Sequence, residues 1–178
     1  MILIIGTPDS GKSTLAENIA VKLSNGQKMA YVATMIPFGE EGEKRIEKHR
    51  KLRATKNFDT FEEAYTVSKL CKEIKTNGYK TALLECVSNL VGNVIHKEEN
   101  LEKKKEDLVC EIISDICEFS NAIDNLVVVA NYFDIDSQYD NDTIKYIDIN
   151  NAVNEKLKLK ADKYIVKEGE EWITYENN

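Results

Sequence analysis

Residues 1–13 read MILIIGTPDSGKS, and this stretch decides the fold. The first five residues are apolar and a glycine follows them, which is typical of a buried parallel strand. Gly6 to Ser13 then matches G-x-x-x-x-G-K-[ST], the spacing of a phosphate-binding loop. From Lys12 onward, apolar residues recur at helical spacing until Asn25-Gly26, which is a helix-stop signal. A strand, this loop and a helix in that order predict a site for a nucleoside triphosphate.

The chemistry of the loop suggests a role for each part of it. Glycines let backbone N–H groups turn toward phosphate oxygens, and the start of the following helix adds partial positive charge. The Lys12 ammonium is expected to reach the β- and γ-phosphates, and the Ser13 hydroxyl is expected to bind Mg²⁺. Glu85 ends an apolar run and is a candidate second metal anchor, although a strand-end acid that faces water is the alternative. Nucleotide contacts are expected from the whole loop: Gly6, Thr7, Pro8, Asp9, Ser10, Gly11, Lys12 and Ser13.

The rest of the chain alternates apolar runs of strand type with segments of helical spacing. Strands are predicted at residues 1–5, 29–33, 81–86 and 126–130, helices at 43–53, 60–76, 101–119 and 143–159, a loop at 36–43, a loop or short helix at 87–96, and a terminal hairpin at 163–166 and 172–174. This order predicts an α/β fold of the P-loop NTPase type, with a mainly parallel sheet, helices on both faces and a C-terminal β-hairpin. With no repeat or linker, residues 1–178 are expected to form a single nucleotide-binding domain.

The composition argues against several classes of protein. The net charge is −7, whereas general nucleic-acid binding needs a basic surface. No apolar run approaches the roughly 20 residues that span a bilayer, so a cytoplasmic protein without membrane insertion is expected. The four cysteines show no C-x-x-C spacing and are expected to be free thiols.

All three arginines of the chain, Arg45, Arg50 and Arg53, fall within residues 45–53. Arginine donates paired hydrogen bonds to phosphate and keeps its charge, so this cluster predicts an anion site; a solvated basic helix face is the alternative. On a helix, Arg45, His49 and Arg53 share one face. Two neighbouring guanidinium groups favour a neutral, nucleophilic imidazole, so His49 is a candidate covalent nucleophile toward a nucleotide phosphate.

Asn131-Tyr132-Phe133-Asp134 follows an expected strand and has a partial likeness to the guanine-reading N-K-x-D motif. The lysine of that motif is missing. We interpret the likeness as coincidence.

Four segments carry a resemblance to a known family, over residues 1 to about 166. They are the opening strand and loop; YVAT at 31–34 followed by RIEKHRKLR at 45–53, similar to R-I-x-x-H-[RK]-x-x-R; FDTFEE at 58–63, similar to W-x-T-x-E-E; and LLEC at 83–86, similar to L-L-[DE]-C. Together they resemble the bifunctional adenosylcobinamide kinase / adenosylcobinamide-phosphate guanylyltransferase family of cobalamin synthesis. The segment around His49 is the most specific of the four.

The resemblance implies two activities and a homotrimer. The kinase phosphorylates a hydroxyl of the corrinoid adenosylcobinamide with ATP or GTP. The transferase takes GMP from GTP onto a histidine, here His49, and passes it to adenosylcobinamide phosphate. The resemblance also implies nucleotide contacts beyond the loop, from Ala33, Thr34, Met35, Arg50, Lys51, Leu52, Arg53, Glu62 and Glu85. Arg45, from the arginine cluster, is expected to join them.

Two alternatives stay open on the sequence. Asp9 stands where the family often has arginine, and the family's E-V-G and V-P-E-N segments are absent after Asn131. A P-loop kinase or nucleotidyltransferase with another acceptor would explain the changed C-terminal half. A non-catalytic, nucleotide-binding regulatory protein would explain both departures.

Overall fold

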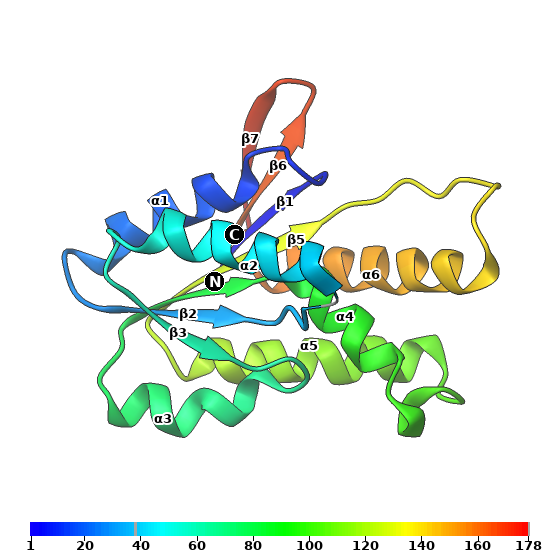
Figure 1. The fold of residues 1–178 in the computed structure, drawn as a ribbon, viewed down its shortest axis with the longest axis horizontal. Coiled ribbons are helices and arrows are strands. Elements are labelled where there is room, and N and C mark those ends of the chain that lie inside the picture. Colours follow the sequence, from blue (N-terminus) through cyan, green and yellow to red (C-terminus); the bar gives the residue numbers. More distant parts are fainter. Residues whose placement is uncertain (38, 178) are drawn as a thin grey trace.

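The fold is built on one sheet with the strand order β3-β2-β4-β5-β1-β6-β7 (Figure 1). The computed structural model describes residues 1–37 and 39–177, without the side chains of Glu41, Arg45, Lys48, His49 and Leu52. The strands are β1 (Ile2–Gly6), β2 (Met29–Ala33), β3 (Phe58–Glu62), β4 (Thr81–Glu85), β5 (Asn125–Asn131), β6 (Lys163–Glu168) and β7 (Glu171–Glu176). Neighbouring strands are parallel except in the β6–β7 hairpin.

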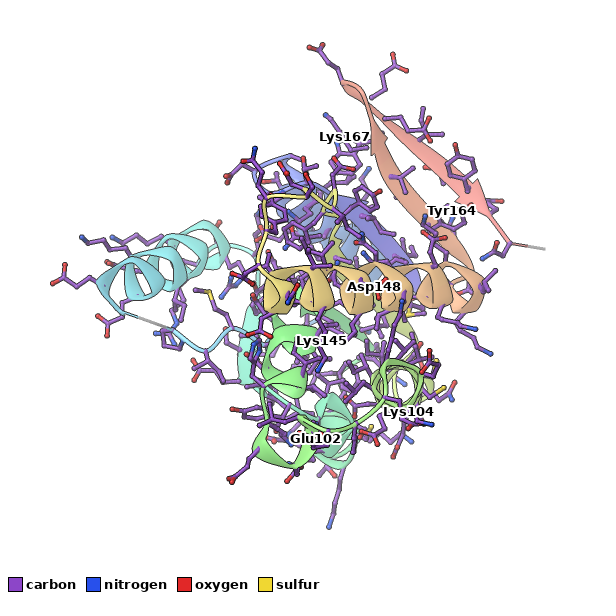
Figure 2. All side chains as sticks on the ribbon, turned by 90° about the vertical axis from the view of Figure 1, so that its right-hand side faces the viewer. Glu102, Lys104, Lys145, Asp148, Tyr164 and Lys167 are labelled. Atoms are coloured by element: carbon purple, nitrogen blue, oxygen red, sulfur yellow. The ribbon has the colours of Figure 1, made fainter. Side chains whose placement is uncertain are left out.

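Helices cover both faces of this sheet (Figure 1). They are α1 (Lys12–Ser24), α2 (Gly39–Arg53), α3 (Cys71–Thr76), α4 (Val87–Ile95), α5 (Lys105–Asn121) and α6 (Asn141–Lys160), with short 3₁₀ turns η1 (Val67–Leu70) and η2 (Glu98–Asn100). In Figure 2, α2 projects from one side of the body, and the hairpin that carries Tyr164 and Lys167 lies on the opposite side. The predicted fold class, with its parallel sheet and terminal hairpin, is confirmed.

Alternation along the strands divides the core into two layers. Leu3 and Ile5 of β1 face an apolar cluster shared with α3, α4, α5 and α6. Ile4, between them, faces a second cluster with Ala16 and Ala20 of α1. Since both faces of β1 are covered, the strand reads as an unbroken apolar run.

Strand β3 corrects the prediction of one helix over residues 60–76. Phe58–Glu62 pairs in parallel with β2, and helical structure resumes only at η1 and α3. The side chain of Glu63 accepts the backbone N–H groups of Tyr65 and Thr66, which turns the chain after the strand. The apolar residues of this segment fit helical spacing, but pairing with β2 at the sheet edge overrides that local pattern.

Other boundaries shift by a few residues. Helix α2 begins at Gly39, inside the loop predicted over 36–43, while α5 begins four residues later than residue 101. Residues 87–96, left open between loop and helix, contain α4. Helix α6 begins where the Asp140 side chain accepts the Thr143 N–H at 2.7 Å.

A buried ion pair ties the helix of the phosphate loop to the chain that follows α2. Lys56 donates a short hydrogen bond to Glu17 of α1, whose side chain is 3% exposed. The segment that follows α2 is therefore held against α1. Within residues 1–37 and 39–177, no helix is long and apolar enough to cross a membrane.

Candidate nucleotide site

The phosphate loop connects β1 to α1, and two of its glycines are needed for its shape. A Cβ atom on Gly6 would lie 2.5 Å from Ser10 Oγ and 3.1 Å from Trp172 of β7. Gly11 has φ 87°, in the left-handed region that favours glycine. Ser10, Trp172 and the start of α1 thus surround a tightly curled backbone.

Lys12 is held inside this loop. Its side chain is largely buried, and Nζ donates to the carbonyl oxygen of Thr7 at 3.0 Å. Asp9, at the exposed tip, also has a positive φ of 59°. The loop is therefore preshaped, with its lysine turned back across it.

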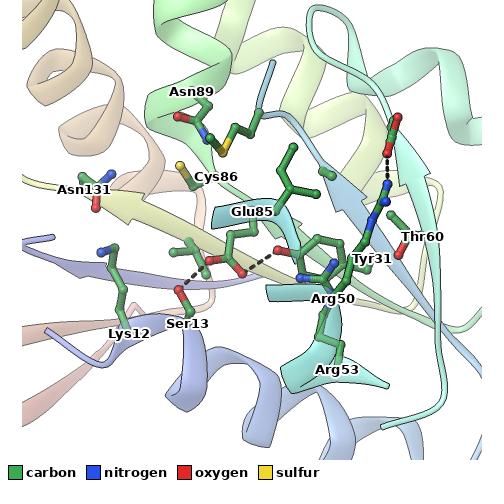
Figure 3. Close-up of a pocket in the computed structure, with 15 residues that line it drawn as sticks. Lys12, Ser13, Tyr31, Arg50, Arg53, Thr60, Glu85, Cys86, Asn89 and Asn131 are labelled. Carbon is green, nitrogen blue, oxygen red and sulfur yellow. Dashed lines mark hydrogen bonds and ion pairs between the residues drawn. The ribbon is translucent and has the colours of Figure 1, made fainter. Parts of the chain in front are cut away.

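Glu85 ends β4 and receives two hydrogen bonds (Figure 3). Ser13 Oγ donates to Oε1 at 2.5 Å, and the hydroxyl of Tyr31 donates to Oε2 at 2.9 Å. Ser13 and Glu85, which the sequence indicates separately as candidate Mg²⁺ ligands, are thus in direct contact although they lie far apart in the sequence. Among the described residues, no group of three or more His, Cys, Asp or Glu side chains could hold a metal. A hydroxyl and a single carboxylate suit Mg²⁺, which takes few protein ligands when nucleotide phosphates supply others.

Tyr31 links this carboxylate to helix α2. The guanidinium carbon of Arg53 lies 3.4 Å from the centre of the Tyr31 ring, and both residues are buried. Burial, and then the charge of Glu85, raise the pKa of Tyr31 above its ordinary value, while the charge of Arg53 opposes them. Arg53 Nη1 has no hydrogen-bond partner among the described residues. A buried guanidinium nitrogen at this place is suited to an anionic ligand.

One pocket collects eight of the predicted site residues (Figure 3). Its lining is Lys12, Ser13, Tyr31, Ala33, Met35, Ile46, Arg50, Arg53, Thr60, Glu62, Glu85, Cys86, Asn89, Val129 and Asn131. Arg50 Nη2 also donates to Glu62 Oε1 at 2.7 Å, so two of the predicted contacts pair with each other across the rim. Strands β2 to β5 each contribute a residue at or near the carboxyl end, where the ends of parallel strands converge, and β2 and β3 also contribute Tyr31 and Thr60 from their middles.

Some predicted contacts lie elsewhere. Lys51 pairs with Glu47 on the exposed side of α2 and is not in the lining. Thr34 is fully buried beneath the pocket, where its hydroxyl donates to the Cys86 carbonyl at 2.7 Å. Arg45, His49 and Leu52 belong to α2, but their side chains lie outside the described part of the structure.

Sequence reasoning missed several residues of the lining, chiefly Tyr31, Thr60, Asn89 and Asn131. Two of them, Tyr31 and Thr60, lie within strands, and Asn131 is the last residue of β5. The available signal for Asn131 was its place just after a predicted strand, whereas Tyr31 and Thr60 are the central residues of their strands, where no local signal marks them. Such residues become candidates once the strand order is known.

Comparison with known proteins finds similar solved structures and a matching family model. A solved structure described as an ATPase domain superimposes with a TM-score of 0.54 at 10% identity, covering 93% of this chain and 68% of that one. The flagellar accessory protein FlaH from Methanocaldococcus jannaschii gives a TM-score of 0.48 at 15% identity, covering 97% and 74%. No curated protein has significant sequence similarity to the chain. The family model described as cobinamide kinase / cobinamide phosphate guanyltransferase matches residues 2–171. The chain belongs to this family.

Proposed function

We propose that this chain is a cytoplasmic adenosylcobinamide kinase and adenosylcobinamide-phosphate guanylyltransferase that works through a GMP-histidine intermediate. Residues 1–178 form a single nucleotide-binding domain, and three copies assemble into a homotrimer, as the family resemblance implies. The substrates are a nucleoside triphosphate, GTP or ATP, and the corrinoid acceptor.

One observation carries the proposal: a single pocket joins the phosphate loop to helix α2. Lys12 and Ser13 of the loop line it together with Arg50 and Arg53, which follow His49 by one and four residues in the sequence. A nucleotide held by the loop would therefore have its phosphates near the helix that carries the histidine.

For the kinase, Lys12 binds the β- and γ-phosphates, and the backbone of the loop cradles them. Ser13 and Glu85 hold Mg²⁺, which when bound neutralises phosphate charge. The terminal phosphoryl group passes to the corrinoid hydroxyl, which loses its proton, and the nucleoside diphosphate leaves.

For the transferase, an imidazole nitrogen of His49 attacks the α-phosphorus of GTP, and the bond to the β-phosphate oxygen breaks to release pyrophosphate. A phosphate oxygen of adenosylcobinamide phosphate then attacks the same phosphorus, which breaks the P–N bond and yields adenosylcobinamide-GDP. Arg50 and Arg53 hold phosphate oxygens during both steps.

The test is to incubate the protein with Mg²⁺ and GTP labelled at either the α- or the γ-phosphate. Label is expected only from α-labelled GTP, stable to base and labile to acid, as for a phosphoramidate. His49→Ala should abolish the label and keep GTP binding. His96→Ala is the matched control, because His96 is the only other histidine and bonds to Gly92 away from the pocket.

Two further measurements separate the alternatives. Lys12→Ala should impair phosphoryl transfer most, and unchanged transfer would remove the loop from the kinase reaction. Visible absorbance after gel filtration reports corrinoid binding. Covalent label without a bound corrinoid would indicate another acceptor, and GTP binding without label would indicate a nucleotide-binding protein that lacks transferase activity.

A further inference from the structure

Asn131 lies between the two parts of the nucleotide site. It is the last residue of β5, which runs between the strand of the phosphate loop, β1, and the strand of Glu85, β4. In the register of the sheet, Asn131 pairs with Gly6, the first residue of the loop. In Figure 3 it lies at the Lys12 end of the pocket, away from Arg50 and Thr60. Its position is therefore at the phosphate end of the site.

The backbone of Asn131 is fixed by dedicated side chains. Its N–H donates to Ser88 Oγ at 2.9 Å, while its carbonyl accepts Asn150 Nδ2 at 2.8 Å and Asn154 Nδ2 at 2.9 Å. The next residue, Tyr132, donates its N–H to the Gly6 carbonyl at 3.1 Å. These bonds satisfy the main chain of Asn131 and leave its side chain free to serve the pocket.

The side-chain amide of Asn131 has an unmet hydrogen-bonding need. The residue is 9% exposed, and Oδ1 has no partner among the described residues. A buried amide oxygen without a partner is unfavourable unless a ligand completes its hydrogen bonding. Its NH₂ group donates two hydrogen bonds, and phosphate oxygens only accept. Rotation of the side-chain amide by 180° exchanges Oδ1 and Nδ2, and it places the donating NH₂ group where Oδ1 has no partner among the described residues.

We propose that the side-chain amide of Asn131 donates a hydrogen bond to the terminal phosphate of the bound nucleoside triphosphate. It thereby distinguishes a triphosphate from a diphosphate and positions the phosphoryl group that is transferred. The inference rests on the proposed nucleotide site, but neither on the corrinoid acceptor nor on the role of His49.

The test compares two probes, GDP and the non-hydrolysable analogue guanosine 5′-(β,γ-imido)triphosphate, titrated with Mg²⁺ by calorimetry. Asn131→Leu keeps the approximate size of the side chain and removes its hydrogen bonds. It should weaken binding of the triphosphate analogue about tenfold, or about 1.4 kcal/mol, and change GDP binding less than twofold. Asn131→Asp, of the same shape but with only acceptors and a negative charge, should weaken triphosphate binding further. If the leucine variant does not fold, the aspartate variant tests the same quantity, which is the ratio of the affinity for the triphosphate analogue to the affinity for GDP.

Asn100→Leu is the matched control. Asn100 is also buried, at 3% exposure, with an unpartnered Oδ1, but it lies outside this pocket. Its variant should leave both affinities unchanged even if its melting temperature falls. An unchanged triphosphate-to-diphosphate ratio in a folded Asn131 variant would overturn the inference, as would an equal change of ratio in the control.

The result also separates the inference from the proposed function. If the ratio falls in the Asn131 variants but the wild-type protein shows neither corrinoid phosphorylation nor covalent label, the inference stands and the proposed function fails. If the wild type performs both reactions and the ratio is unchanged, the function stands and the inference fails. A wild type that binds neither nucleotide would overturn both.

Discussion

Tyr31→Phe removes one oxygen atom and tests how Glu85 is held. The lost hydroxyl donates to Glu85 Oε2 at 2.9 Å in a residue that is 4% exposed. The ring remains, and with it the Arg53 stacking at 3.4 Å and the edge contact with Phe58 at 6.0 Å between ring centres. The variant therefore isolates the hydrogen bond from the packing.

The expected loss follows from the charge of the acceptor. A hydrogen bond to a charged group contributes about 1.5–3 kcal/mol, so we expect the free energy of unfolding to fall by about 2 kcal/mol. For a chain of this size, 1 kcal/mol corresponds to roughly 2–4 °C, which gives a fall in melting temperature of about 4–8 °C. Calorimetric melting and urea unfolding measure it. Tyr139→Phe, at an exposed tyrosine, is the control and should change little.

The same variant has a signature at high pH. The pKa of Tyr31 is raised in the folded protein, so above about pH 10 the unfolded chain releases this proton while the folded chain keeps it. The stabilising contribution is complete below that pH and is lost as the pH rises, because the unfolded state then binds fewer protons. The difference in free energy of unfolding between wild type and Tyr31→Phe should therefore become smaller above about pH 10. A melting temperature within 1 °C of wild type near pH 7 would refute the claim that this bond holds Glu85.

Three further predictions follow from buried or charged groups. Lys56→Met should lower the free energy of unfolding by about 3 kcal/mol or more, because it leaves the Glu17 carboxylate buried without its partner. Urea unfolding should show that stability recovers when Glu17→Leu is added, and no recovery would contradict the ion-pair explanation. Burial raises the pKa of Cys86 to about 11, so its thiolate fraction at pH 8 is about 10⁻³. The exposed Cys110 should therefore react with a disulfide reagent before Cys86 does, and equal labelling of the two in peptide mapping would contradict this order. Asp9→Asn removes an exposed negative charge from the phosphate loop. Calorimetry should show that the variant binds a nucleoside triphosphate about threefold more tightly at low salt, with a smaller gain in affinity at high salt. A gain in affinity that does not depend on salt would exclude charge as its cause.

Local sequence signals were sufficient for the core of the fold. The loop at Gly6 to Ser13, the fully apolar strands and the Asn25-Gly26 stop each act within a few neighbouring residues, and β2 is found at its predicted residues. The sequence also marks Ser13 and Glu85 separately as candidate Mg²⁺ ligands, but it does not predict the hydrogen bond between them.

Long-range pairing explains what the sequence did not reveal. Phe58–Glu62 becomes a strand only because β2 offers it an edge, which no local pattern shows. The sequence places Tyr31 in a strand but does not show its role. That role depends on two contacts with residues distant in the sequence, the hydrogen bond to Glu85 and the stacking of Arg53 on its ring. Asn131 gains its place from the insertion of β5 between β1 and β4, which follows from strand order and not from spacing.

The central place of β1 sets the order in which a growing chain can fold. Strands β2, β3 and β4 can pair as soon as residue 85 has left the ribosome, whereas β1 must wait for β5 and then for β6, which begins at Lys163. At about 5–20 residues per second, synthesis from residue 85 to residue 131, where β5 ends, takes about 2–9 s. During that time the most apolar strand of the chain, although made first, has no partner. The phosphate loop is thus translated early but assembled late, because the strand that carries it stays unpaired until β5 has been made.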